Sequence, residues 1–237
     1  MLAAVKRQFS ETEPELMDLP NLQEADLRTD LEHLGRINRT FGGKQAVEKM
    51  FRLLAPPVAR LRLIDIASGY GDHGRNLLEH ARRRQMELSV VAVDVQWQTL
   101  KIARQATPPG QRMLFVQADA RHLPFRSREA DLVFCSLALH HFSEPDALSV
   151  LKEMARVGKL GTACIDLVRS RLAAFAIWLL TTFLMRDPMV RHDARLSVRR
   201  AFTHEELLDL TARAGWPQQL QTRFFWFQQA VRAHFHP

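Results

Sequence analysis

The stretch Leu61–Gly74 most constrains the fold of this chain, because an apolar run ends there in a glycine-rich turn. The run contains β-branched residues and reaches Asp65, and the glycines Gly69, Gly71 and Gly74 follow in the spacing G-x-G-x-x-G. A helical pattern of apolar side chains begins directly afterwards. A strand, a tight turn and a helix in this order form the opening unit of a nucleotide-binding α/β domain. Glycine suits such a turn because the backbone bends sharply and passes close to a ligand.

Acidic residues stand at the carboxyl ends of the first three expected strands. Asp65 belongs to the first, Asp94 to the second and Asp119 to the third. A carboxylate about 20 residues beyond the glycines is the expected ribose ligand, so Asp94 fits either NAD or S-adenosylmethionine (SAM). Asp65 favours SAM, which carries a sulfonium and an ammonium group but no phosphate. Asp119 is placed to accept a hydrogen bond from the adenine amino group. Each acid alone also fits a turn or a helix cap.

Four sequence blocks together resemble the class I SAM-dependent methyltransferases, and most closely the small-molecule branch that includes the ubiquinone/menaquinone-type enzymes. These blocks are Asp65–Gly71, Asp94, Asp119–Phe125 and Ala130–Phe142, in the order of the family. One departure is Ala67, which stands where the family usually has its first glycine, and we expect a modified loop that keeps the site. The resemblance implies SAM as the cofactor, bound by Asp65, Ala67, Gly69, Gly71, Asp94, Val95, Asp119, Ala120 and Cys135.

The resemblance and the alternation of strands with helices predict a doubly wound α/β fold. We expect a mostly parallel, seven-stranded, Rossmann-like sheet with helices on both faces, formed by residues 56–237. Thr203–Glu206 matches a capping box and predicts the start of a helix. The β-rich tail at 220–233 predicts a closing hairpin.

An N-terminal helical arm, residues 1–55, is expected to precede this domain. Helical spacing of apolar residues over 21–34 and 45–54 predicts two helices, with the glycine-containing stretch 35–43 between them. The arm is expected to pack over the mouth of the cofactor site. Arg39, or its neighbour Arg36, is a candidate partner for the methionine carboxylate of SAM, although an exposed arginine is the plainer interpretation.

An insertion at about 169–200, after the fifth strand, predicts a lid. Its segment 172–185 is almost wholly apolar but too short for a membrane span, which needs about 20 residues. We expect a buried helix over the active site; peripheral contact with a membrane is the alternative. Residues 191–202 are expected to form a polar loop, where functional residues often lie. An apolar lid indicates a lipophilic or aromatic acceptor.

Candidate catalytic residues are His140, His141 and His192, because histidine titrates near neutral pH and can take a phenolic or acidic proton. His140 and His141 follow the fourth strand at the sheet edge where ligands bind. Adjacent side chains are expected to point in different directions, so the pair is a poor chelate, and no Cys/His cluster has zinc spacing. We therefore expect no metal. Packing or surface roles are the alternative for each histidine.

The composition of the chain limits the classes of partner that it can bind and indicates its cellular compartment. The net charge is +7 and the isoelectric point about 10.1, but the basic residues are scattered, which disfavours nucleic acid as a partner. The cysteines, Cys135 and Cys164, fall in the fourth and fifth expected strands and indicate buried thiols in a reducing compartment. The N-terminus lacks the pattern of a signal peptide, so we expect a cytoplasmic protein. No pattern indicates an oligomeric state.

The predicted function is SAM-dependent methyl transfer to a small aromatic or polyketide/quinone-like molecule, with oxygen preferred over carbon as the acceptor. Such a transfer requires alignment of the acceptor with the methyl group and exclusion of water. Residues 135–138 differ from the Asn/Asp-Pro-Pro-aromatic motif of amino-methylating enzymes, which disfavours nitrogen acceptors. The alternatives are a C-methyltransferase, an NAD(P)-dependent oxidoreductase, and a non-catalytic SAM-fold protein that binds a partner.

Overall fold

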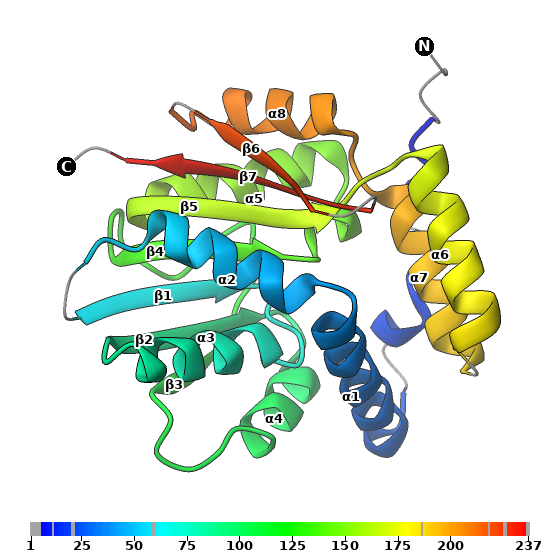
Figure 1. Cartoon of the computed structure of the whole chain (residues 1–237), viewed down its shortest axis with the longest axis horizontal. Coiled ribbons are helices and arrows are strands. Elements are labelled where there is room, and N and C mark those ends of the chain that lie inside the picture. Colours follow the sequence, from blue (N-terminus) through cyan, green and yellow to red (C-terminus); the bar gives the residue numbers. More distant parts are fainter. Residues whose placement is uncertain are drawn as a thin grey trace.

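A seven-stranded sheet of order β3-β2-β1-β4-β5-β7-β6 runs through the molecule (Figure 1). The first five of these strands are parallel, and β7 is antiparallel to both of its neighbours, as predicted. The strands are β1 (Arg60–Ile66), β2 (Glu87–Asp94), β3 (Met113–Gln117), β4 (Ala130–Ser136), β5 (Gly158–Leu167), β6 (Leu220–Phe224) and β7 (Gln228–His234). The computed structural model describes residues 6–10, 12–19, 22–57, 60–185, 187–217, 219–224 and 227–235.

Both faces of the central strands are buried, which explains why these strands are continuous apolar runs. On one face, Leu61 and Leu63 of β1 pack with residues of α2 (Gly43–Leu54) and α3 (Asp72–Arg83). On the other face, apolar residues of β1 and β4 pack against α5 (Glu144–Val157) and α8 (His204–Arg213). The strand order reverses between β1 and β4, which places the ligand site outside their carboxyl ends.

The expected capping box and the expected N-terminal helices are present, although one helix is longer than predicted. Thr203 and Glu206 cap α8 reciprocally. The first N-terminal helix, α1 (Glu24–Thr40), continues past the predicted end at Leu34, and α2 begins at Gly43 after Gly42 in a left-handed conformation. Gly35 lies inside α1, where it packs closely against Tyr70. Helix α4 (Trp97–Gln105) connects β2 to β3.

The insertion after β5 forms two helices, α6 (Arg171–Leu184) and α7 (Pro188–Arg200), which lie side by side at one end of the sheet (Figure 1). The predicted polar loop over 191–202 is wrong, because α7 occupies most of it. Asp187 caps this helix through a bond from the backbone N–H of Met189, and Val190 and Leu196 are buried. Within the described ranges, no helix is long and apolar enough to cross a membrane.

Candidate active site

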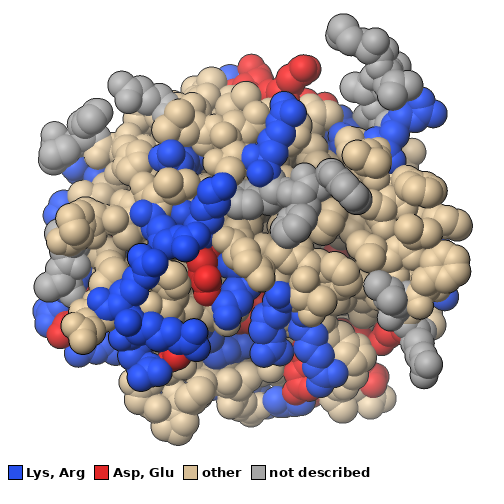
Figure 2. Space-filling view, in the orientation of Figure 1, with Lys and Arg blue, Asp and Glu red and all other residues tan. Residues whose placement is uncertain are grey.

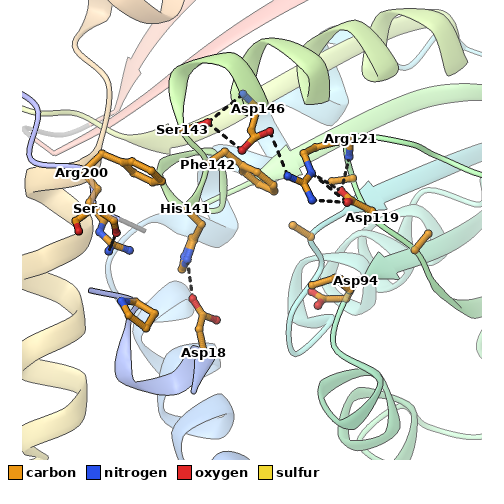
Figure 3. A pocket seen from close by; sticks show the side chains of 16 residues that line it. Ser10, Asp18, Asp94, Asp119, Arg121, His141, Phe142, Ser143, Asp146 and Arg200 are labelled. Atoms are coloured by element: carbon orange, nitrogen blue, oxygen red, sulfur yellow. Dashed lines mark hydrogen bonds and ion pairs between the residues drawn. The ribbon is translucent and has the colours of Figure 1, made fainter. Parts of the chain in front are cut away.

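A cavity of about 470 Å³ opens at the carboxyl ends of β1, β2 and β4. Its walls combine the loop after β1, the loop after β4, helix α1 and the lid helices. A second hollow of about 410 Å³ borders it over the loops after β2 and β3 and shares several lining residues with it (Figure 3). The shared residues are Asp18, Ala67, Asp94, Val95, His141 and Phe142.

The glycine-rich loop has the left-handed conformation that the motif predicted. The φ angles are +51° at Gly69 and +69° at Gly71. A Cβ atom at Gly71 would lie 2.9 Å from the Cε atom of Met113, whereas a Cβ atom at Gly69 would meet nothing within 4 Å. Ala67 also has a positive φ of +49°, a conformation that costs an L-residue roughly 1–2 kcal/mol. The loop therefore retains the glycine-type backbone at the position where alanine replaces glycine.

Asp94 lies at the centre of the two hollows and holds the glycine loop in place. Its Oδ2 accepts a hydrogen bond of 2.9 Å from the backbone N–H of Gly69, and its Oδ1 accepts one of 3.0 Å from Gln96. Burial raises the pKa of this carboxyl above its usual range. Asp94 lines both hollows together with Val95, which is the position expected for a ribose ligand.

Asp65 is buried and does not belong to the described walls of the cavity. Its Oδ2 lies near Gly74 in the first turn of α3 and has no hydrogen-bond partner among the described residues. Burial, reinforced by the nearby carboxylates of Asp72 and Asp94, raises the pKa of Asp65 to about 8. The structure thus places this acid behind the loop, where it is mostly protonated at neutral pH and does not contact the described cavity walls.

Asp119 and Ala120 line the second hollow, where Arg121 forms an additional contact that sequence reasoning missed. The guanidinium of Arg121 binds both carboxylate oxygens of Asp119 and also reaches Asp146 at 3.2 Å (Figure 3). These bonds lower the pKa of Asp119. Asp119 therefore stays ionised beside the expected adenine position. No local pattern distinguished Arg121 from the other scattered arginines.

Two predicted cofactor residues lie away from the described cavity walls. Cys135 is fully buried in β4 among core residues. Arg39 is exposed on α1, and its Nε donates a hydrogen bond of 3.2 Å to the carbonyl of Gly35. The structure does not bring either side chain to the expected SAM position.

His140 and His141 lie in a short 3₁₀ turn, Leu139–His141, that follows β4. Their rings are 4.5 Å apart and inclined by 35°, so the expectation that the two side chains diverge was wrong. The tight turn brings adjacent rings to the same side. The Nδ1 atom of His140 lies 2.6 Å from Oδ1 of Asp166, and Nδ1 of His141 lies 2.9 Å from Oδ2 of Asp18.

Glu15 completes this cluster, and sequence reasoning did not identify it. Its carboxylate is buried, with Oε1 at 3.7 Å from Nε2 of His140 and Oε2 at 3.6 Å from Nε2 of His141. Burial alone would lower the pKa of His141, but Glu15 and Asp18 raise it to about 10. His141 is therefore a cation at neutral pH in this arrangement.

His192 lies outside this group. It is half exposed on α7, and its Nδ1 atom is 2.9 Å from Oδ1 of Asp193. Asp193 in turn accepts hydrogen bonds from the backbone N–H groups of Leu16 and Met17. His192 therefore belongs to the contact between α7 and the N-terminal segment rather than to the described cavity walls.

A family profile described as "Methyltransferase domain" matches residues 63–161. A demethylmenaquinone methyltransferase from Roseiflexus castenholzii is 32% identical over 177 residues, which cover 69% of this chain and 71% of that protein. A protein named ubiquinone/menaquinone biosynthesis C-methyltransferase, from Xylella fastidiosa, is 32% identical over 139 residues, which cover 57% of this chain and 50% of the relative.

Solved structures share the fold at low sequence identity. The SAM-dependent methyltransferase from Aquifex aeolicus superposes with a TM-score of 0.62 and 17% identity, covering 88% of this chain and 98% of that chain. Human N-acetylserotonin methyltransferase, solved in complex with SAM, gives a TM-score of 0.65 and 16% identity, covering 91% of this chain and 57% of that chain. The arrangement of sheet and helices is therefore one that other methyltransferases use.

Proposed function

Because this chain belongs to the class I SAM-dependent methyltransferases, we propose that it methylates a lipophilic, hydroxylated aromatic or quinone-like molecule at a ring carbon. The observation that carries the proposal is the cavity, which joins the glycine loop after β1 to the apolar walls of α1 and α6. One end fits the cofactor and the other fits an apolar acceptor. His140 and Glu15 line the same cavity.

The loop residues fit SAM. Open space lies where a Cβ atom of Gly69 would stand, and Asp94 lies beside it on the cavity wall. Val95 and Ala120 offer apolar surface in the adjoining hollow for the adenine ring. When bound, SAM supplies a methyl group on a sulfonium that is readily displaced. The protein has to hold the acceptor in line with that methyl group and exclude water.

The acceptor end of the cavity is apolar on several sides, which favours a lipophilic ring. His140 interrupts this surface. Its Nδ1 is engaged by Asp166, so its Nε2 is oriented toward Glu15 and the cavity. An acceptor hydroxyl at this position would lose its proton to Nε2, which increases the electron density at the neighbouring ring carbons. The apolar walls are formed by Leu34, Ile37, Phe41, Ile177, Leu180 and Phe227.

A carbon acceptor is favoured by the names of the two curated relatives, one of which is a C-methyltransferase. The preference for oxygen from the sequence stays a prediction that product analysis decides. The purified protein should be incubated with SAM and a demethylated naphthoquinol, or with a simple phenol, and the product examined by mass spectrometry and NMR. C-methylation leaves both quinol hydroxyls exchangeable, whereas O-methylation removes one of them.

Binding and turnover measurements also distinguish a methyltransferase from a partner-binding protein and from an oxidoreductase. SAM binding without turnover across quinols, phenols and polyketide-like acids would support a non-catalytic protein that binds a partner. Binding of NADH rather than SAM in a calorimetric titration would support an oxidoreductase. Transfer to a ring carbon is the result that we expect.

We also propose that the outer face of α6 rests on a membrane surface from which a lipophilic acceptor enters. Phe175, Trp178 and Phe183 are exposed, although the helix was predicted to be buried. The opposite face of the helix contributes Ile177 and Leu180 to the cavity. Figure 2 supports this assignment, because the region of α6 carries few charges, whereas Lys and Arg side chains gather over α2 and α3. A helix that is apolar on both sides can connect the bilayer to the cavity.

A further inference from the structure

Three potential ligand atoms converge on one point at the junction of the N-terminal segment and the turn after β4. They belong to Glu15, His140 and His141, and they all lie within 4.8 Å of one another. The two Nε2 atoms are 3.7 Å and 3.6 Å from the carboxylate oxygens of Glu15. We infer that these three residues form a site for a divalent transition-metal ion of the zinc type.

The distances fit an ion at the centre of the three atoms. Zinc binds imidazole nitrogen at roughly 2.0–2.1 Å and carboxylate oxygen at roughly 2.0–2.2 Å. Tetrahedral geometry then separates neighbouring ligand atoms by about 3.3 Å. The two separations between Glu15 and the histidines need to contract by only a few tenths of an ångström, and the two histidine nitrogens lie within 4.8 Å of each other. Two imidazoles and one carboxylate are also a ligand set that catalytic zinc sites use.

Each ligand has a partner that fixes its orientation. Asp166 holds Nδ1 of His140, and Asp18 holds Nδ1 of His141. Because Nδ1 of each ring is engaged by a carboxylate, Nε2 is the ring nitrogen that faces Glu15. Ser197 donates a hydrogen bond of 2.6 Å to Oε1 of Glu15. Metal-binding histidines are usually supported in this way by a carboxylate or carbonyl on the second ring nitrogen.

The cluster also concentrates negative charge in a buried place. The carboxylates of Glu15 and Asp166 are buried and that of Asp18 is partly buried. Two nearby guanidinium groups are directed elsewhere: Arg7 donates to the carbonyl of Phe142, and Arg200 donates to the carbonyl of Ser10. Buried carboxylates require a compensating cation. A divalent ion bound by Glu15 would supply such a cation.

The site has an open side. Glu15, His140 and His141 all line the cavity, so a fourth coordination position faces the proposed acceptor. Catalytic zinc sites keep such a position for water or substrate. This step rests on the proposed function: the acceptor would bind in that position through its phenolate oxygen, with the phenolic proton released to solvent. The ion would then take over from Nε2 of His140 the role of stabilising the oxygen anion. Metal binding itself does not depend on that step.

The test uses the full-length protein after dialysis against a chelator. Zn²⁺ binding is measured by competition with a chromophoric chelator, and Co²⁺ is added to read the coordination geometry from its visible spectrum. We expect one ion per chain at this site and a tetrahedral Co²⁺ spectrum. Glu15→Gln and His140→Gln should abolish that spectrum, whereas Asp166→Asn should weaken affinity by about 10–100-fold, as changes in supporting residues do.

Matched variants identify the source of any binding. His192→Gln removes an imidazole beside a carboxylate but outside the cluster and should leave Zn²⁺ affinity unchanged. A second group of possible ligands, Asp30, His33 and Asp187, lies elsewhere. If Zn²⁺ binds at that group, His33→Gln should reduce the Zn²⁺ affinity. The inference is overturned if wild-type protein binds no Zn²⁺ more tightly than Glu15→Gln does, or if only His33→Gln reduces binding.

SAM affinity and thermal unfolding, measured on the same variants, show that each one is folded. If the cluster binds no Zn²⁺ while SAM binding and methyl transfer are intact, the metal site is overturned and the proposed function stands. If the cluster binds Zn²⁺ but no methyl group is transferred to any quinol or phenol, the metal site stands and the proposed function is overturned.

Discussion

The buried carboxylate of Asp166 accepts two hydrogen bonds from His140. Its Oδ1 lies 2.6 Å from Nδ1 of the imidazole ring, and its Oδ2 lies 2.9 Å from the backbone nitrogen. Two bonds from one residue to both oxygens of one carboxylate fix the position of the imidazole ring and its tautomer. The Nε2 atom is therefore aimed at the cavity before any acceptor binds. This preorganisation makes His140, and not His192, the histidine whose removal should affect the reaction.

We expect His140→Ala to lower the methyl-transfer rate about 10²–10⁴-fold, the range for loss of an assisting acid or base. SAM affinity should change little, because the ring lies beyond the glycine loop. His192→Ala is the control and should retain the wild-type rate. Single-turnover rates with a quinol acceptor, together with calorimetric SAM titrations, measure both quantities. Equal rates for the two variants would show that His140 does not assist the reaction.

The second prediction concerns the glycine loop. Gly69→Val should abolish SAM binding, because the new side chain projects into open space beside Asp94 that the cofactor needs. Gly110→Val is a matched control, because Gly110 also has a positive φ and open space around it but lies in the turn between α4 and β3. Both variants carry similar backbone strain, so comparable losses of stability are expected in thermal unfolding. SAM binding by Gly69→Val would show that the loop is only structural.

The sequence was informative where the signal is local. Each of three patterns depends on residues that are close together in the chain. The glycines predicted the turn, the apolar runs predicted the strands of the sheet, and Thr203 with Glu206 predicted the capping box; all three are present. The polar composition of α7 was misleading because its buried face, which includes Val190 and Leu196, also contains the polar residues Asp193, Ser197 and Arg200.

The candidate site was predicted less completely, because its contacts join distant segments. Asp18 and His141 are 123 residues apart, and His140 and Asp166 are 26 residues apart. Neither separation corresponds to a helical or strand period. Glu15 carried no signal, since its environment is created by chain segments that meet only in the folded protein.

The third prediction is a pH dependence of stability. The pKa of Asp65 is raised from 3.8 to about 8 by burial and by Asp72 and Asp94, so the folded protein binds this proton more tightly than the unfolded chain. The stabilising contribution is fully present below pH 3.8 and is lost as the pH rises through about 8. Each pH unit within this window lowers the free energy of unfolding by at most about 1.4 kcal/mol.

Asp65→Asn should remove this slope, because the amide does not ionise. Urea unfolding at pH 5, 7 and 9 measures it, and the variant should gain stability relative to wild type as the pH rises. Asp119→Asn is the control: the pKa of Asp119 is lowered from 3.8, so its contribution changes only as the pH falls below that value, and the profile of this variant from pH 5 to 9 should run parallel to that of wild type. Parallel pH profiles for wild type and Asp65→Asn would contradict the prediction.

The fourth prediction tests the outer face of α6 against lipid. Phe183 is 73% exposed and Trp178 is 47% exposed, and burying one such side chain in a bilayer interface contributes about 1.5–3 kcal/mol. Phe183→Ser should therefore weaken binding to neutral phosphatidylcholine vesicles by roughly 10–100-fold in a flotation assay. Leu114→Ser is the control, because Leu114 is 64% exposed on the edge strand β3, away from the lid. Equal vesicle binding by both variants would contradict membrane contact through α6. If analytical ultracentrifugation instead shows that Phe183→Ser loses self-association, this face contacts a second copy of the chain.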